Sequence, residues 1–288
     1  MKKRCLGKKI LGVFMAAALS CMAFAGCGRS SSSGSSSGKD TLTSVLQSKK
    51  LKVGCILANA PYGSKDASGN PEGYDVDVAY LLADSLGIDH SNVEFVDLNA
   101  ADRIPALESG KVDVVIGNFT ITLERAQKVD FTDPYDAGAV GVMTSPDKKI
   151  EHASELAGKK VAAAKGSTNQ VSAEKLNASG VNFDLTLYDS ADDMEMALQS
   201  GQVDAIIGDA PYCSYKEKIS PDKYAYCVKD SSEMLMPAFY NAFGVQRGDT
   251  EWLQYLNQFI FQINTDGSNN ELYEKYLGKR TTPLNPNY

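Results

Sequence analysis

The chain has 288 residues, of which 43% are hydrophobic and 23% are charged. This composition is typical of a globular protein with one large domain or two smaller ones, and it excludes a disordered or fibrous chain. The formal net charge is −7 and five basic residues lie among the first nine, so the rest of the chain is more acidic still. Such a charge argues against nucleic acid as a partner.

The N-terminal segment has the pattern of an export signal. Its basic residues precede an apolar run over 10–25, which is shorter than the roughly 20 residues that a membrane-spanning helix needs. The run ends in Phe24, Ala25, Gly26 and Cys27. This ending resembles the bacterial lipobox, although Phe24 departs from the commoner leucine. The resemblance implies that residues 1–26 are a lipoprotein signal peptide and that Cys27 is lipidated. An ordinary cleaved secretory signal, with Cys27 incidental, is the alternative.

Residues 28–38 are serine and glycine apart from Arg29. Such a segment cannot bury apolar surface and favours a flexible tether. We therefore expect residues 27–38 to form the lipidated cysteine and its tether, with the folded body beginning near Lys39.

The first half of the body has the pattern of alternating strands and helices. Strands are predicted over 51–57 and 93–98, with a helix over 75–86 between them. The second half repeats this order, with strands over 160–164 and 185–188 on either side of a helix over 169–177. Together with a further helix and strand described next, each half is predicted to be β-α-β-α-β, which indicates the α/β class.

An internal repeat extends this order in both halves. Residues 106–117 (ALESGKVDVVIG) and 197–208 (ALQSGQVDAIIG) match at most positions and lie 91 residues apart. Each copy predicts a helix that ends at Ser-Gly, where glycine can adopt a left-handed conformation, followed by a buried parallel strand. We therefore expect two similar lobes, each with an open, mostly parallel sheet flanked by helices. Because such sheets bind ligands beyond the carboxyl ends of their strands, a cleft is expected where the lobes face each other.

Two more helices are predicted after the second half. Asp249 or Thr250 can cap an amphipathic helix that ends at Gly267, and a shorter helix over 270–277 is stopped by Gly278. We expect both to return to the first lobe.

Cysteine and histidine are too few to suggest a metal or catalytic centre. The body holds Cys55, Cys213 and Cys227, without any C-x-x-C spacing, although a bridge between Cys213 and Cys227 remains an alternative. His90 and His152 lie in no hydrolase motif and are expected at the surface. We expect no cofactor and no metal.

Polar residues follow both repeated strands. An amino acid needs a cation with nearby hydrogen-bond donors for its carboxylate, and an anion for its ammonium group. Arg125 and Asp209 can supply this pair from opposite lobes. Thr120 can add a hydroxyl or backbone N–H, Asn118 a main-chain carbonyl, and the turn over 166–168 the free N–H groups of a helix N-terminus. Taken singly, Arg125 could instead be a solvated helix residue and Asp209 a helix cap.

Several segments in this order resemble the polar amino-acid family of bacterial solute-binding proteins, family 3. They are Pro61-Tyr62, GYDVDVA over 73–79, NFTITLER over 118–125, FTDPY over 131–135, GST over 166–168, VDAIIGD over 203–209 and LYEKYLG over 272–278. The resemblance covers residues 40–280. It implies the two-lobed type II periplasmic-binding-protein fold and the amino-acid-binding component of an ABC transporter.

The resemblance also implies roles for single residues. Arg125 would bind the α-carboxylate with help from Thr120, Ser167 and Thr168, and Asp209 would bind the α-ammonium group. The ring of Tyr62 would lie against the ligand side chain, unless it packs only on its own lobe.

Arg103 lies in a segment over 102–107, DRIPAL, which is similar to one in binders of acidic amino acids and cysteine. It is therefore the candidate for side-chain specificity, with a surface salt bridge as the alternative. Asp189, Asp192 and Asp193 argue against an acidic ligand, because a carboxylate near these aspartates would be repelled. Ile56 argues against it as well, because it stands where the resemblance implies a further basic residue in some binders of dicarboxylic amino acids.

The predicted organisation places lobe 1 at residues 39–136 and 238–288, lobe 2 at 142–233, and a hinge at 137–141 and 234–237. We expect a monomeric, non-enzymatic protein, lipid-anchored at the extracellular face of the membrane of a Gram-positive bacterium. It would bind a free polar amino acid, with an acidic or cysteine-like one favoured, close around it and pass it to the permease subunits. An exported enzyme similar to the cyclohexadienyl dehydratases is the alternative. A receptor sensor domain would need a spanning helix after the body, which this sequence does not contain.

Overall fold

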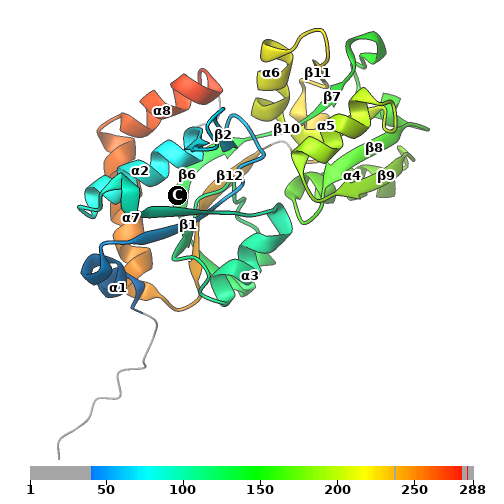
Figure 1. Cartoon of the computed structure of the whole chain (residues 1–288). Coiled ribbons are helices and arrows are strands. Elements are labelled where there is room, and N and C mark those ends of the chain that lie inside the picture. The colour runs from blue at the N-terminus through cyan, green and yellow to red at the C-terminus, as the bar shows by residue number, and fades with distance from the viewer. Residues whose placement is uncertain (1–39, 237, 281–283, 285–288) are drawn as a thin grey trace, which may run out of the picture. The chain divides into compact units, whose positions relative to one another are not determined.

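The computed structural model describes residues 40–236, 238–280 and 284. The predicted signal peptide, Cys27 and most of the tether lie outside the described residues, as do residue 237 of the predicted hinge and most of the C-terminal tail. Two separate five-stranded sheets form the body, each flanked by helices (Figure 1). Among the described residues, no helix combines the length and the apolar character needed to cross a membrane.

The first sheet has the strand order β4-β1-β5-β12-β6. Its strands are β1 (Leu51–Cys55), β4 (Val93–Asp97), β5 (Val114–Val115), β6 (Val129–Gly138) and β12 (Phe239–Gln246). β4, β1 and β5 pair in parallel, whereas β12 is antiparallel to both β5 and β6. A small hairpin of β2 (Ser64–Lys65) and β3 (Pro71–Glu72) lies outside this sheet.

The second sheet has the order β11-β7-β10-β8-β9. Its strands are β7 (Val140–Thr144), β8 (Lys160–Ala164), β9 (Asp184–Tyr188), β10 (Ala205–Asp209) and β11 (Ala225–Cys227). β10, β8 and β9 pair in parallel, and β7 is antiparallel to both β10 and β11. In each sheet a single strand therefore runs against the other four, which confirms the predicted open, mostly parallel sheets.

Every predicted helix is present, and α1 (Thr41–Ser48) and α6 (Ala210–Ile219) are found in addition. In lobe 1 they are α1 (Thr41–Ser48), α2 (Tyr74–Ser85), α3 (Arg103–Glu108), α7 (Thr250–Thr265) and α8 (Ser268–Leu277). In lobe 2 they are α4 (Thr168–Ala178), α5 (Ala191–Gln199) and α6 (Ala210–Ile219). Predicted boundaries differ by one or two residues, as for β1, which ends at Cys55 rather than at residue 57.

Trp252 shows why the last two helices return to lobe 1. Its side chain is fully buried in the core between α7 and the first sheet, and its indole N–H donates to the carbonyl of Asp113 at 2.9 Å. The apolar stripe of α7 and Tyr273 of α8 complete this core.

The two repeat copies fold in the same way down to single hydrogen bonds. α3 and α5 both end in Ser-Gly, and Gly110 and Gly201 have left-handed φ values of 68° and 73°. The aspartate before each strand accepts a hydrogen bond from the start of the neighbouring strand. Lys52 N donates to Asp113 at 2.9 Å, and Lys160 N donates to Asp204 at 3.0 Å. The repeat in the sequence is therefore a repeat in the structure.

Two chain segments connect the sheets. The first passes from β6 to β7 through Ala139, whose carbonyl accepts a hydrogen bond from Ala210 N at 2.7 Å. The second enters β12, where Phe239 pairs with Gly138 and Tyr240 with Ala137. The two crossings therefore lie side by side, at positions that overlap the predicted hinge.

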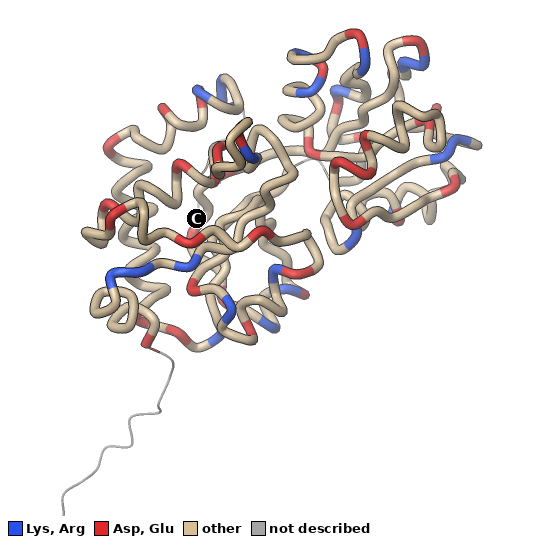
Figure 2. The backbone as a smooth tube through the Cα atoms, in the orientation of Figure 1, with Lys and Arg blue, Asp and Glu red and all other residues tan. Residues whose placement is uncertain are grey.

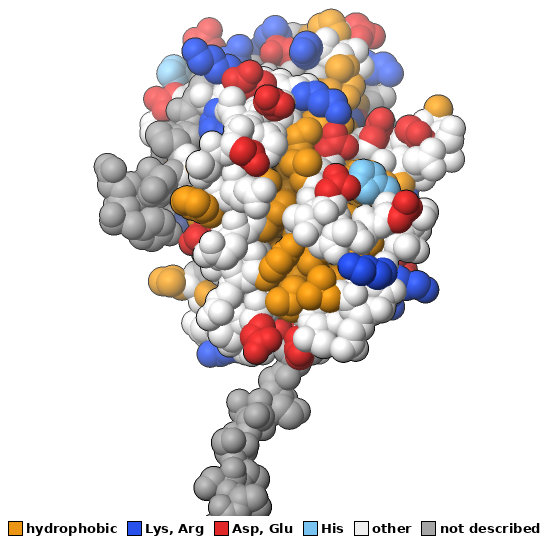
Figure 3. Space-filling model, turned by 90° about the vertical axis from the view of Figure 1, so that its left-hand side faces the viewer, with side chains coloured by type: hydrophobic (Ala, Val, Ile, Leu, Met, Phe, Trp, Pro, Cys, Tyr) orange, Lys and Arg blue, Asp and Glu red, His pale blue; other side chains and the backbone are white. Residues whose placement is uncertain are grey.

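Acidic and basic residues are both spread along the backbone of the two lobes (Figure 2). The face in Figure 3 carries an apolar strip between interspersed acidic and basic groups. This face offers no basic stripe of the kind that tracks a nucleic-acid backbone.

Candidate functional site

A cavity lies at the carboxyl ends of the parallel strands and is lined from both lobes. Lobe 1 contributes Ile56, Ala58, Asn59, Asn99, Ala100, Arg103, Asn118 and Thr120. Lobe 2 contributes Ala164, Ser167, Thr168, Asn169, Asp189, Ser190, Ala191, Met194, Gly208, Asp209 and Tyr212. Most of the predicted site residues are brought together here.

Asp209 is the anionic group of this cavity. It is the last residue of β10 and only 7% exposed. One carboxylate oxygen accepts a hydrogen bond from Asn169 Nδ2 at 3.1 Å, and the other accepts one from the side-chain amide of Asn118 in lobe 1. Burial raises the pKa of Asp209, and the two amide donors oppose this shift by stabilising the carboxylate. A buried carboxylate in this setting can bind an ammonium group.

Asn118 occupies the tip of the equivalent strand in lobe 1. Its φ of 47° lies in the left-handed region, which asparagine tolerates better than most residues. Its backbone N–H donates to Asp75 at 2.9 Å, and its carbonyl accepts from Arg103 at 2.7 Å. This carbonyl, which was expected to face an ammonium group, is bound in the structure by the guanidinium of Arg103. The side-chain amide of Asn118 reaches across to Asp209 instead.

Arg125 begins the short 3-10 helix η3 (Arg125–Gln127) and is partly buried beside the ring of Phe119. Its guanidinium donates to the carbonyl of Thr120 at 2.7 Å and to that of Gly166 in lobe 2 at 3.0 Å. Burial lowers the pKa of Arg125 to about 10, partly opposed by Glu124 and Asp209, so the group stays cationic at neutral pH. Arg125 does not line the cavity, and these two bonds use two of its five N–H groups.

Thr120, Ser167 and Thr168 meet where the lobes approach each other. The hydroxyls of Thr120 and Thr168 lie 3.4 Å apart, and Thr120 also donates to Asn241 at 3.0 Å. Ser167 is the N-cap of α4, because its hydroxyl accepts from Gln170 N at 3.2 Å. The predicted helix N-terminus is therefore present at the cavity, with its positive dipole end toward an anion.

Arg103 lines the cavity and is only 3% exposed, so the alternative of a surface salt bridge is wrong. Its guanidinium donates to the carbonyls of Ala100, Gly117 and Asn118 and lies over the ring of Phe119. Desolvation lowers the pKa of Arg103 to about 9. Through these hydrogen bonds Arg103 mainly stabilises the end of the strand at Gly117 and Asn118.

Tyr62 does not lie at the cavity. Its side chain is 1% exposed, belongs to the lobe 1 core and contacts the ring of Tyr74 edge to face. The prediction of an aromatic lid on the ligand is wrong for this residue, because Tyr62 packs on its own lobe. Asn59, three residues earlier, lines the cavity instead.

Of the three aspartates that were expected near the ligand, only Asp189 lines the cavity. Asp189 lines the cavity, 3.9 Å from the amino group of Lys165, and Ile56 lines it from lobe 1. Asp192 and Asp193 lie in the first turn of α5 and do not line the cavity. The carboxylate of Asp193 accepts a hydrogen bond from the hydroxyl of Ser190, the N-cap of α5. The carboxylates that line the cavity are therefore those of Asp189 and Asp209.

Sequence reasoning missed three amides that line the cavity, those of Asn59, Asn99 and Asn169, and a fourth behind its wall, that of Asn241. Asn169 follows Thr168 in the first turn of α4, so its place beside the predicted turn could have suggested it. Asn241 is fully buried on β12, and no sequence signal connects it with Asn118 and Thr120.

The cysteines and histidines of the body lie outside the cavity lining. Cys55, Cys213 and Cys227 are buried free thiols, so the alternative of a Cys213 to Cys227 bridge is wrong. His90 and His152 lie at the surface, each 2.9–3.0 Å from a carboxylate.

Comparison with known proteins agrees with this architecture. The profile of the bacterial extracellular solute-binding proteins, family 3, matches residues 51–279. The chain belongs to this family. The predicted two-lobed type II fold is also confirmed by solved structures. The solute receptor for L-cysteine of Neisseria gonorrhoeae is 31% identical with a TM-score of 0.74, covering 82% of this chain and 93% of that one.

Two further relatives of this family 3 protein carry different names. The ABC transporter glutamine-binding protein GlnH of Bacillus subtilis is 27% identical over 281 residues, 94% of this chain and 97% of that protein. The ancestral amino acid-binding protein AncCDT-1, described as a precursor of cyclohexadienyl dehydratase, is 30% identical with a TM-score of 0.74. It covers 82% of this chain and 99% of the other.

Proposed function

We propose that this protein binds a free amino acid outside the cytoplasm and delivers it to the permease of an ABC importer. The buried carboxylate of Asp209, which closes one side of a cavity lined from both lobes, is the observation that carries this proposal. It would bind the α-ammonium group, while Arg125 and the N-terminus of α4 would bind the α-carboxylate. Relatives named for cysteine and glutamine support the ligand class.

The wall of the cavity favours an uncharged polar side chain. Asp189 would repel a second carboxylate, and Arg103 already donates to three carbonyls. Of the two classes expected from sequence, acidic and cysteine-like, the cysteine-like class therefore fits better. The apolar lining by Met194, Ala100 and Ala191 suits a small side chain.

We also propose that a lipid anchors the protein to the membrane. A lipid on Cys27 and the Ser/Gly tether would hold a monomeric body at the outer face of the membrane. One acyl chain alone binds a membrane only weakly, so multiple acylation would be required for lasting attachment. Mass spectrometry of membrane-derived protein would detect the modified cysteine, and an unmodified N-terminus would refute it.

A thermal-shift screen of the 20 common amino acids tests the binding function. A ligand at 100 times its Kd stabilises the folded state by about 2.7 kcal/mol. We expect cysteine or a similar small polar amino acid to raise Tm most, and calorimetry to give one site per chain. If no amino acid shifts Tm, the proposal is wrong.

An enzymatic function is the second candidate, because one relative is the precursor of a dehydratase and burial raises the pKa of Asp209 as a proton donor would require. Incubation with prephenate or arogenate, followed by product assay, separates the two functions. We expect no product, since Asp209 is hydrogen-bonded to two amides, and the other carboxylate that lines the cavity, that of Asp189, lies beside Lys165.

A further inference from the structure

Asn241 lies behind the cavity wall rather than in it. It is fully buried on β12, immediately after the crossing between the lobes. Its amide nitrogen donates to Asn118 Oδ1 at 2.6 Å and to Asp136 Oδ2 at 2.8 Å, and its carbonyl oxygen accepts from Thr120 Oγ1 at 3.0 Å. One side chain thus holds two residues that line the cavity.

These bonds determine which way the amide of Asn118 faces. A carboxylate can only accept, so Asp136 requires the nitrogen of Asn241 on its side. That nitrogen then occupies Oδ1 of Asn118. The NH₂ group of Asn118 is left to face Asp209, to which it donates across the lobes. Asn118 therefore presents donors to the cavity, and its second N–H is available to an acceptor on a ligand.

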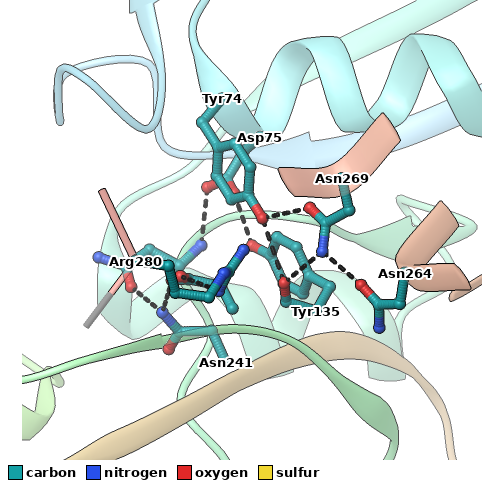
Figure 4. A network of polar contacts seen from close by, with 9 residues as sticks. Tyr74, Asp75, Tyr135, Asn241, Asn264, Asn269 and Arg280 are labelled. Atoms are coloured by element: carbon teal, nitrogen blue, oxygen red, sulfur yellow. Dashed lines mark hydrogen bonds and ion pairs between the residues drawn. The ribbon is translucent and has the colours of Figure 1, made fainter. Parts of the chain in front are cut away.

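Asp136 is itself held by a wider network. The guanidinium of Arg280, which is 12% exposed, lies 3.8 Å from the other oxygen of the fully buried Asp136. Burial raises the pKa of Asp136 to about 6, which leaves it ionised at neutral pH. Figure 4 shows Asn241 and Arg280 in one part of this network, and Asn269 with Asn264 in another.

We propose that Asn241 is a positioning residue for ligand binding, which fixes Asn118 as a donor and orients the hydroxyl of Thr120. This inference rests on the proposed amino-acid-binding function. Asn241 does not line the cavity, but two of its three side-chain hydrogen bonds are to residues that do, Asn118 and Thr120. The third is to Asp136, which orients the amide.

The test compares two buried asparagines whose side chains make the same number of hydrogen bonds. Asn269 also donates twice, to Tyr135 O at 2.8 Å and Asn264 Oδ1 at 2.6 Å, and accepts once, from Tyr74 at 2.6 Å. None of its partners lines the cavity. Asn241→Leu and Asn269→Leu should therefore lower Tm comparably, because each leaves several buried groups unpaired.

Binding should separate the two variants. The probe is the amino acid that raises the wild-type Tm most in the screen above, measured by calorimetry. We expect Asn241→Leu to weaken its affinity about tenfold, and Asn269→Leu to leave it within about twofold. If Asn241→Leu does not fold, Asn241→Ser replaces it, because the shorter side chain cannot reach Asn118.

A double-mutant cycle distinguishes positioning from general loosening. Asn118→Gly removes the amide and suits the left-handed φ. In that background Asn241→Leu should cost clearly less than tenfold, the remainder coming from Thr120, whereas independent effects would add.

Equal affinity of wild type and Asn241→Leu, or equal losses in both leucine variants, would overturn this inference and leave the proposed function standing. A wild-type protein that binds no amino acid would overturn both.

Discussion

The two copies of the internal repeat share a helix, a turn and a strand, but they differ at the residue that follows the strand. In lobe 1, Gly117 leads into Asn118, whose left-handed conformation turns the chain toward Thr120 and Arg125. In lobe 2, Gly208 leads into Asp209 without a break in the strand, and α6 begins at the next residue. One framework therefore supplies donors and cations from one lobe and a carboxylate from the other. Since a zwitterion needs both, the difference between the copies matters more for function than their similarity.

Removing either charged group that is expected to bind the ligand, Asp209 or Arg125, should give the largest effect. Asp209→Ala and Arg125→Ala should each weaken binding of the amino acid found in the screen by on the order of 3 kcal/mol, because each leaves a ligand charge uncompensated. Calorimetry measures this loss. Asp192→Ala removes an exposed charge outside the cavity lining and serves as the control. Unchanged affinity in both site variants would refute the assignment.

The buried carboxylate behind the lobe 1 tip should make stability depend on pH. Desolvation is the largest cause that raises the pKa of Asp75 to about 8, with Asp136 adding to it and Tyr135, Asn118 and Arg103 opposing it. A carboxyl group whose pKa is raised in the folded state stabilises that state at low pH, and this contribution is lost as pH rises through the folded pKa.

Between pH 6 and 7.5 the free energy of unfolding should therefore fall by about 2 kcal/mol. Chemical denaturation across this range measures the slope, which should become shallower in Asp75→Asn. His152, which is ion-paired with Glu233, has a raised pKa and adds a slope of the same sign. The difference between wild type and Asp75→Asn is therefore the decisive quantity, and identical slopes would contradict the assignment.

The smallest expected effects concern the shared framework. Asp113→Ala and Asp204→Ala remove equivalent hydrogen bonds to the start of a neighbouring strand, so each should cost about 1 kcal/mol. Asp204 should cost slightly more, because it also pairs with Lys148 at 3.0 Å. Hydrogen exchange should show faster exchange at Lys52 N in the first variant and at Lys160 N in the second. Faster exchange in both lobes of either variant would show that the effect of this hydrogen bond is not local to its own lobe.

Much of the fold could be predicted because its signals are local. The Ser-Gly helix ends, the Val/Ile strands and the amphipathic stripe of α7 are properties of short segments, and the structure departs from them by only one or two residues. The site could be predicted less completely. Asn118, Thr120, Thr168 and Asp209 were found because they follow repeated strands or begin a helix.

Tyr62 and Asn241 show where the sequence is insufficient. Tyr62 is three residues from Asn59, which lines the cavity. Its ring nevertheless belongs to the lobe 1 core, where it packs against Tyr74, and the sequence does not show this packing. Asn241 is far in sequence from Asn118, and the pairing of β12 with β6 brings it into place.

By itself the sequence determined that two similar α/β lobes would present an aspartate and an arginine after corresponding strands, because periodicity and turn residues act over short stretches of chain. Only the tertiary structure decided which atoms face the cavity. Buried polar groups must satisfy one another, and their partners come from strands and helices that are distant in sequence. For this reason the carbonyl of Asn118 is bound by Arg103, while its amide is directed at Asp209.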